Sequence, residues 1–133
     1  MLSQKEKQQI CSKRHQDKLM STKEGCIKRR LFETRYRAKK LKIPFDLTLD
    51  YLISIFPDKC PVFNTTLTWG HQTGKILPTS PSLDKIDSSK GYTIGNVQWL
   101  SNMANSMKHK ATPEQLHQFA NWVKNSVSVT VSD

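Results

Sequence analysis

Residues 80–108 read SPSLDKIDSSKGYTIGNVQWLSNMANSMK, and this stretch decides which fold the chain can adopt. Short apolar runs at 83–86 and 97–100 each have the length of a strand, and the ten residues between them contain the turn-forming Ser88-Ser89-Lys90-Gly91. A helix is expected to follow, from about Asn102 to His109. The stretch therefore predicts a strand, a loop, a second strand and a helix.

Helices are predicted on both sides of this unit. Ser21-Thr22-Lys23-Glu24 matches a capping box, in which a hydroxyl and a glutamate three residues later satisfy free N–H groups, and Pro44 ends the helix that follows. Thr48 is a candidate N-cap for a short helix that Pro57 stops, and Thr112-Pro113-Glu114-Gln115 begins a C-terminal helix. The apolar stripes that these helices should bury are Ile27, Leu31, Thr34, Ala38 and Leu41 in the first, Leu49, Leu52, Ile53 and Phe56 in the second, and Leu116, Phe119, Ala120 and Val123 in the last.

The whole pattern predicts an α+β fold. Residues 58–82 are rich in Pro, Thr, Gly and Asn and contain short apolar stretches at 60–63 and 67–69, so we expect strand and loop there. We divide the chain into a basic helical arm (1–44), a domain built on the two strands and their helix (45–125), and a C-terminal tail (126–133) that is left unassigned.

The composition suits a soluble globular protein with one modest core. The 133 residues are 36% hydrophobic, and no apolar run approaches the roughly 18 residues that a membrane helix needs. The N-terminus lacks the apolar region of a secretory signal, so we expect a cytoplasmic location and no membrane partner. Cys11, Cys26 and Cys60 are far apart and form no Cys-x-x-Cys pair, which argues against disulfides and against a structural zinc site.

The positive charge is concentrated at one end of the chain. Residues 1–44 hold fourteen Lys and Arg against four acidic residues, whereas residues 45–133 balance seven Lys against seven acidic residues. A basic segment on a neutral body is typical of nucleic-acid-binding proteins, because each phosphate contact releases condensed counterions; the alternative is a solvated helix that only keeps the protein soluble. The expected nucleic-acid contacts are Arg29, Arg30, Arg35, Arg37, Lys39 and Lys40, together with Lys90 and Lys108.

Three polar side chains in residues 80–108 are candidates for a site that hydrolyses phosphodiesters. Such hydrolysis needs a cation on the phosphate, and Mg²⁺ prefers oxygen ligands such as those of aspartate and asparagine. Asp84 lies at the end of the first strand, and we expect it to face the first turns of the helix that carries Asn105. Lys108 is on the same helix face as Asn105 by i, i+3 spacing. The two metal ligands, Asp84 and Asn105, would therefore lie close to the Lys108 ammonium, which could bind a phosphate.

The order of the residues in this stretch resembles that of a known family. The matching segments are Ser82-Leu83-Asp84-Lys85-Ile86-Asp87, Ser89-Lys90-Gly91-Tyr92, Gly95-Asn96-Val97 and Ala104-Asn105 with Lys108. They resemble the HNH endonucleases, whose motif is also called the His-Me or ββα-metal finger, and above all a phage-borne subgroup with Ser-Leu-Asp-Arg/Lys-Ile-Asp in place of Asp-His. A weaker similarity extends upstream to Lys59-Cys60-Pro61-Val62 and downstream through the capped helix, covering roughly residues 45–125.

The resemblance implies a ββα-metal finger packed with flanking helices, and a metal-dependent DNA endonuclease or nickase. Asp84 and Asn105 would hold Mg²⁺ or Mn²⁺, Asn96 would brace the loop through hydrogen bonds, and Lys108 would contact phosphate. Double-stranded DNA is the expected substrate, clamped by the basic helix, with RNA as the alternative. One site per chain implies nicking unless two chains pair, and the choice between monomer and homodimer stays open. A phage origin, and with it a bacterial host cytoplasm, is implied by the resemblance alone.

Lys85 departs from the family pattern. It stands where HNH enzymes place the histidine general base, and a protonated lysine cannot accept a proton. The base would then be His71 in the preceding loop, Tyr92 in the loop between the strands, or a metal-bound hydroxide held near the phosphate by Lys85 as an electrostatic stabiliser. His109, near the helix end, is a less favoured candidate.

Two further alternatives stay open in the sequence. Asp87 is either a second carboxylate near the metal or, as we favour, a turn residue whose side chain caps the Ser88-Ser89 turn. Because Lys85 replaces the base, the chain could also be a DNA- or RNA-binding protein that keeps the fold without cutting. Such a protein would include a phage regulatory factor. A third, less favoured possibility is a phage protein whose basic arm binds an acidic host protein.

Overall fold

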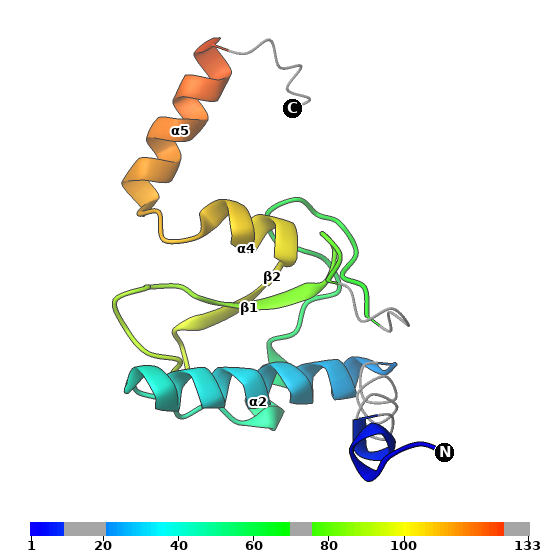
Figure 1. Cartoon of the computed structure of the whole chain (residues 1–133). Helices are drawn as coiled ribbons and strands as arrows, with labels where there is room; N and C mark the ends of the chain where they lie inside the picture. Colours follow the sequence, from blue (N-terminus) through cyan, green and yellow to red (C-terminus); the bar gives the residue numbers. More distant parts are fainter. Residues whose placement is uncertain (10–20, 70–75, 127–133) are drawn as a thin grey trace.

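The computed structural model describes residues 1–9, 21–69 and 76–126. In this part of the chain residues 4–9 are helical, and the remaining elements are α2 (Lys23–Leu41), α3 (Leu49–Ser54), β1 (Pro81–Lys85), β2 (Val97–Ser101), α4 (Asn102–Lys108) and α5 (Pro113–Ser126), as Figure 1 shows. None of the described helices is long and apolar enough to cross a lipid bilayer. The predicted α+β class is confirmed, with a two-stranded antiparallel sheet as its β component.

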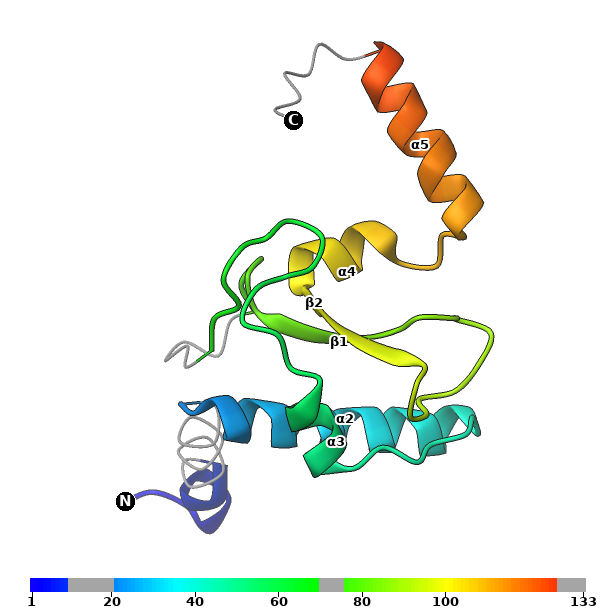
Figure 2. The same cartoon turned by 180° about the vertical axis from the view of Figure 1, so that it is seen from behind.

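The sheet has different neighbours on its two faces. β1 and β2 pair so that Leu83 lies opposite Trp99 and Asp84 lies opposite Gln98. Because successive side chains of a strand point to opposite faces, the first pair and the second pair lie on opposite sides of the sheet. Figures 1 and 2 show α2 and α3 along one side and α4 along the other. The functional residues of β1 are therefore divided between two faces.

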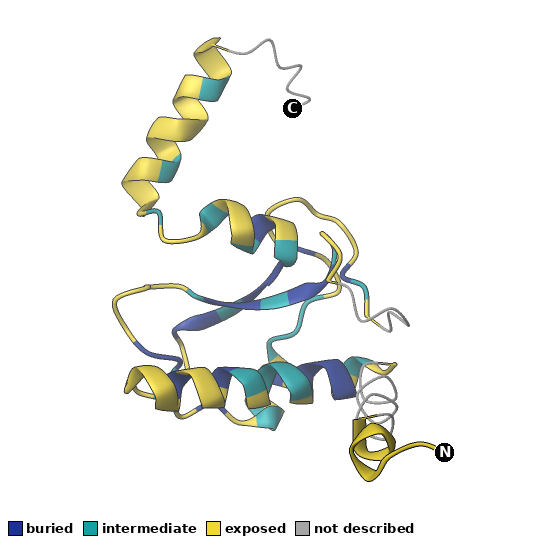
Figure 3. Cartoon of the chain, viewed as in Figure 1, coloured by how far each residue is buried: buried dark blue, intermediate teal, exposed yellow. Residues whose placement is uncertain are grey.

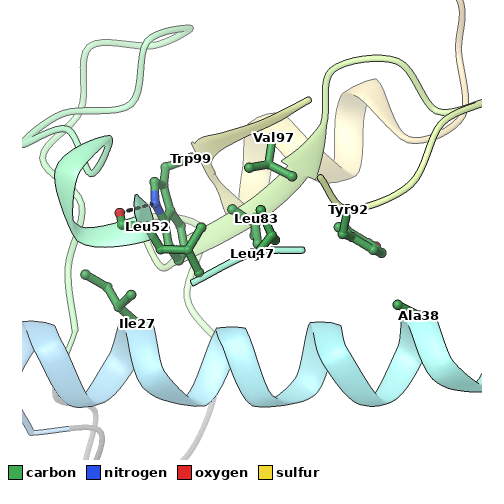
Figure 4. Packing of buried hydrophobic residues seen from close by; sticks show 8 residues of the cluster. All are labelled: Ile27, Ala38, Leu47, Leu52, Leu83, Tyr92, Val97 and Trp99. Carbon is green, nitrogen blue, oxygen red and sulfur yellow. Dashed lines mark hydrogen bonds between the residues drawn. The ribbon is translucent and has the colours of Figure 1, made fainter. Parts of the chain in front are cut away.

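The main core lies between the sheet and α2 (Figure 4). Its buried residues are Ile27, Ala38, Leu47, Leu52, Leu83, Tyr92, Val97 and Trp99. The Trp99 indole N–H donates a hydrogen bond to the carbonyl oxygen of Leu52 at 3.1 Å, which satisfies the one polar atom of that side chain. Since Ile27 and Ala38 come from α2, residues of the predicted basic arm and of the predicted domain pack in one core.

α2 begins one residue later than the sequence suggests. The N-cap is Thr22 rather than Ser21, and its Oγ1 accepts a hydrogen bond from the Gly25 N–H at 3.0 Å. The helix ends at Leu41 because Lys42 takes a left-handed conformation with φ 56°. Leu41 was expected in the buried stripe, but it is 58% exposed because it lies in this last turn.

Two other predicted caps are confirmed. Thr48 Oγ1 accepts a hydrogen bond from the Tyr51 N–H at 3.2 Å and begins α3. Before α5, Thr112 Oγ1 accepts from the Gln115 N–H at 3.1 Å, while Gln115 Oε1 accepts from the Thr112 N–H at 3.0 Å. Such reciprocal pairs satisfy N–H groups that have no partner inside the helix, which is why they could be recognised from four residues.

Residues 58–82 were expected to contain strand and loop, and the apolar stretch at residues 60–63 forms no strand because the chain reverses direction there. The Asn64 N–H donates to the Cys60 carbonyl at 2.8 Å, and the Cys60 N–H donates to the Thr65 carbonyl at 2.8 Å. Asn64 has φ 57°, a value that asparagine tolerates and that a strand excludes. Pro61 has no N–H to contribute to a ladder, so a tight turn with one isolated bridge replaces the strand.

The predicted buried stripe of α5 is also wrong. No residue of this helix is buried, Phe119 is 60% exposed and Trp122 is 56% exposed. Figure 1 shows α5 pointing away from the sheet, and Figure 3 shows its surface as mostly exposed. Helical periodicity in the sequence correctly predicts an apolar face, but it does not predict that the same chain supplies a surface to cover it.

Candidate active site

A cleft of about 480 Å³ lies where β1 ends, between α4 and the C-terminal half of α2. Four residues that the sequence singled out for catalysis line it, namely Asp84, Lys85, Tyr92 and Asn105. Arg37 from α2 and the segment that ends α4, with Ser106, His109 and Lys110, complete much of the wall. The cleft therefore brings together residues from three separate elements.

Among the described residues, Asp84 is the one carboxylate that lines this cleft, and it is only 7% exposed. The Nζ atom of Lys108 lies 3.0 Å from its Oδ2 and 3.2 Å from its Oδ1. Gln98 Nε2 donates a further hydrogen bond to Oδ2 at 3.0 Å. A buried carboxylate requires such partners, and here an ammonium and an amide provide them.

Lys108 is tied to the interior of the protein. Besides the Asp84 carboxylate, its Nζ donates to the Lys85 carbonyl oxygen at 3.0 Å, and its side chain is 22% exposed. The predicted contact of Lys108 with phosphate would require the ammonium to leave Asp84. In the structure its role is to neutralise that carboxylate.

Asn105 lies one helical turn before Lys108 and contacts a different residue of β1. Its Nδ2 donates to Ser82 Oγ at 2.6 Å. Asp84 was expected to face the first turns of α4, but it faces Lys108 in the last turn, while Asn105 is opposite Ser82. This offset arises because α4 runs alongside β1, so one helical turn corresponds to two strand residues. Within the described chain, the Asn105 carboxamide oxygen accepts no hydrogen bond.

Lys85 occupies the opposite face of β1 from Asp84. Its Nζ lies 5.1 Å from the centroid of the Tyr92 ring and 3.5 Å from the Ser88 carbonyl oxygen. Tyr92 is buried, and its hydroxyl oxygen accepts a hydrogen bond from Arg37 Nη1 at 3.3 Å. These three residues form a cationic wall in which one charge lies over the ring of Tyr92 and the other bonds to its hydroxyl.

Asn96 lies outside the cleft and holds the loop between the strands. Its Oδ1 accepts from the Asp87 N–H at 2.9 Å, and its Nδ2 donates to the carbonyl oxygens of Asp87 at 3.1 Å and Gly91 at 2.8 Å. Three hydrogen bonds from one buried side chain fix both ends of this loop. They are the bonds that a bracing asparagine would make.

Asp87 caps the turn that follows β1, which is the alternative we favoured. Its Oδ1 accepts hydrogen bonds from the Ser89 hydroxyl at 2.6 Å and from the Ser89 N–H at 3.0 Å. The Ser89 hydroxyl and N–H together hold the pKa of the Asp87 carboxyl below its usual value, with a smaller contribution from Lys90. Lys90 itself is 70% exposed.

His109, the less favoured candidate base in the sequence, lies in the wall of the cleft. Of the histidines in the described ranges, it alone lines the cleft. It follows α4 with φ 43° and ψ −122°, in a turn closed by a hydrogen bond from the Ala111 N–H to the Lys108 carbonyl at 2.9 Å. A non-glycine residue with positive φ is uncommon and strained. His71, the other candidate imidazole, lies outside the described residues.

Two of the predicted nucleic-acid contacts on α2 have partners within the protein. Arg30 is 17% exposed, and it donates from Nε to the Pro81 carbonyl at 3.1 Å and from Nη1 to Glu33 at 3.0 Å. Arg29 pairs with the other oxygen of Glu33 at 3.0 Å. Arg30 therefore fastens α2 to the start of β1, a function that charge alone does not reveal.

The other predicted contacts on α2 are on the surface. Arg35, Arg37, Lys39 and Lys40 are all exposed. Arg35 lies over the ring of Phe45, 5.6 Å from its centroid, and Arg37 lines the cleft. These four residues present positive charge where a phosphate backbone could reach it.

The donor atoms at the cleft suit a hard divalent cation in type but are few in number. The described residues contain no group of three or more His, Cys, Asp and Glu that could hold a metal ion. An ion here would take one oxygen from Asp84 and one from Asn105, and water and a phosphate oxygen would complete its shell. It would also have to displace the Lys108 ammonium from Asp84.

No protein-family model, curated protein or solved structure matches the chain. What the cleft can bind must therefore be inferred from the charged residues that line it. Arg37, Lys85 and Lys110 line it together with Asp84, whose charge Lys108 already balances. Such an excess of positive charge attracts an anion and stabilises negative charge that develops on it.

Proposed function

We propose that the chain is a metal-dependent endonuclease or nickase of the HNH class that hydrolyses phosphodiester bonds in double-stranded DNA. The observation that carries the proposal is that Asp84 and Asn105, from β1 and α4, line one cleft together with an excess of cationic side chains. The β1–β2–α4 unit would be the ββα-metal finger. A single carboxylate among cations suits a phosphate diester better than it suits a neutral substrate.

Each residue of the cleft has a role in this proposal. Asp84 and Asn105 would hold Mg²⁺ or Mn²⁺, which when bound neutralises phosphate charge and makes water more acidic. Arg37 and Lys85 bind the phosphate oxygens from the opposite wall. Lys108 orients the Asp84 carboxylate before substrate arrives, and its ammonium would contact the phosphate once a metal ion had taken its place at the carboxylate.

His109 is the proton acceptor in this proposal. Lys85 and Arg37 are cations, and the Tyr92 hydroxyl already accepts a hydrogen bond from Arg37. Imidazole is the commonest general base in enzymes, and His109 lines the cleft one turn from Asn105. Its strained backbone supports the assignment, because strain of this kind persists where function requires it.

A plasmid relaxation assay with Mg²⁺ or Mn²⁺ tests the proposal. We expect nicking that EDTA abolishes and that falls at least about a hundredfold in Asp84→Ala and Asn105→Ala. Asp50→Asn is the matched control, because Asp50 is an exposed acid on α3 outside the cleft. Metal-dependent nicking that survives both cleft substitutions would show that the site is elsewhere.

A second candidate function is binding of DNA or RNA without cleavage. The Asp84–Lys108 ion pair favours it, because the protein already neutralises the one carboxylate that could hold a metal. This alternative predicts salt-sensitive binding that is unaffected by EDTA, and no cleavage with any divalent ion. Measurable nicking by the wild-type protein, lost in Asp84→Ala, would exclude it.

A further inference from the structure

Two aromatic side chains are exposed on the outer face of α2. Phe32 is 74% exposed and Tyr36 is 68% exposed. They are four residues apart on one helix, so they are neighbours on the same face. Together with Arg37, Lys40 and Leu41 they line a shallow hollow of about 610 Å³. Adjacent exposed rings form a contiguous apolar patch, and such patches can mark binding sites.

The surroundings of this aromatic pair are strongly cationic. Lys28, Arg35, Lys39 and Lys40 are exposed on the same helix. Glu33 also lines the hollow, but its two carboxylate oxygens are each paired at 3.0 Å, with Arg29 and with Arg30. The hollow therefore offers aromatic faces within a surface that attracts anions.

These features identify the chemistry of the partner. A second copy of the chain would bring two sets of like charges together, which opposes self-association through this face. An unpaired strand of DNA supplies both a flat base to stack on each ring and a phosphate for each neighbouring cation. A continuous duplex hides the faces of its bases and could use only the cations.

The hollow adjoins the cleft, because Arg37 and Leu41 line both. A strand whose phosphate lies in the cleft would therefore come close to the aromatic pair. We propose that Phe32 and Tyr36 stack unpaired bases of the DNA strand that enters the cleft. The preferred substrate is then DNA with a single-stranded segment, such as a gap or a fork, beside the phosphate that is cut. This preference rests on the proposed function, whereas the binding of bases does not.

Fluorescence anisotropy in EDTA tests the binding site without any cleavage. The probes are a labelled single-stranded DNA and an oligonucleotide of equal length that has abasic sites and so keeps its phosphates but lacks bases. We expect the wild-type protein to bind the first probe about 5- to 100-fold more tightly. Phe32→Ala and Tyr36→Ala should each reduce this ratio and leave affinity for the abasic probe unchanged. Phe119→Ala removes another exposed ring, on α5, and should leave the ratio intact.

Several results would overturn the assignment. They are equal affinity for the two probes, a ratio that Phe32→Ala and Tyr36→Ala leave unchanged, and tighter binding of single-stranded RNA than of DNA. A change in sedimentation of these variants without a change in the ratio would assign the face to a protein contact instead. The assay is independent of nicking: base-dependent binding without nicking contradicts only the nuclease, and nicking without base-dependent binding contradicts only the stacking site.

Discussion

Asp84 and Lys108 form an ion pair that is largely shielded from water, with side chains 7% and 22% exposed. At this depth the attraction between the charges is strong, but each charge also depends on the other, because an unpaired buried charge is costly. A divalent cation at Asp84 and the Lys108 ammonium would compete for the same two oxygens. A single substitution in this ion pair is therefore an informative test of metal binding at Asp84.

Replacing Lys108 with glutamine should reveal whether Asp84 can hold a metal. We expect Lys108→Gln to lose about 1–3 kcal/mol of unfolding free energy, because the carboxylate loses its charged partner. Mn²⁺ should restore stability, and its affinity should rise about tenfold, equal to about 1.4 kcal/mol. Thermal unfolding with and without Mn²⁺ measures both effects. The double variant Asp84→Asn with Lys108→Gln should show no response to Mn²⁺, and a response there would contradict the assigned ligand.

His109 allows stability and activity to be separated. Its φ of 43° suits glycine, so His109→Gly should raise the unfolding free energy by roughly 1 kcal/mol. The same change removes the imidazole and should lower the nicking rate by about 10²- to 10⁴-fold. Urea unfolding and a nicking time course measure the two quantities. Asn64→Gly, at φ 57° and outside the cleft, should leave nicking unchanged. Full activity in His109→Gly would remove this residue from the reaction.

At the scale of elements, β1, β2 and α4 could be predicted within a few residues because their signals are local. Alternating apolar residues, the Gly-rich loop and the caps all act over a few positions. The pairing of Asn105 with Ser82 and of Lys108 with Asp84 could not be predicted, since it depends on how α4 packs in three dimensions, where Ala104 joins a buried cluster with Cys60, Leu67 and Leu100. The exposure of α5 was missed for a similar reason. Helical periodicity of apolar residues defines an apolar helix face, but it does not define which surface covers that face.

The loop between β1 and β2 depends on a close approach at Gly91. A Cβ atom there would lie 2.3 Å from the Pro44 carbonyl oxygen, which accepts a hydrogen bond from the Tyr92 N–H at 3.0 Å. Gly91→Ala should therefore destabilise the protein by about 1–3 kcal/mol, because the backbone must move. Gly95 has φ 89° and open space around it, so Gly95→Ala should cost only about 1 kcal/mol. Urea unfolding compares the two variants, and a larger loss in Gly95→Ala would contradict this account of the loop.

At the scale of the whole molecule, the basic helix α2 is packed against the core and is not a separate arm. α2 contributes Ile27 and Ala38 to the core, and Arg30 bonds to the Pro81 carbonyl at the start of β1. The cations on its outer face are thus held in a fixed position relative to Asp84. A polyanion bound along α2 would meet the cleft at Arg37, which belongs to both surfaces.

This arrangement predicts that some positive charges on α2 contribute to DNA binding, whereas others contribute to stability. Lys39→Gln and Lys40→Gln remove exposed charges, so each should lower the slope of log K against log salt for DNA by about 1 and leave stability unchanged. Arg30→Gln removes two hydrogen bonds inside the protein, so it should lower the unfolding free energy by about 1–2 kcal/mol and change the slope little. Anisotropy titrations over a range of salt concentrations, together with urea unfolding of the same variants, separate the two contributions. If Arg30→Gln changed the slope as much as Lys40→Gln does, then Arg30 would contact phosphate despite its burial, and α2 would have to shift away from β1 when DNA binds.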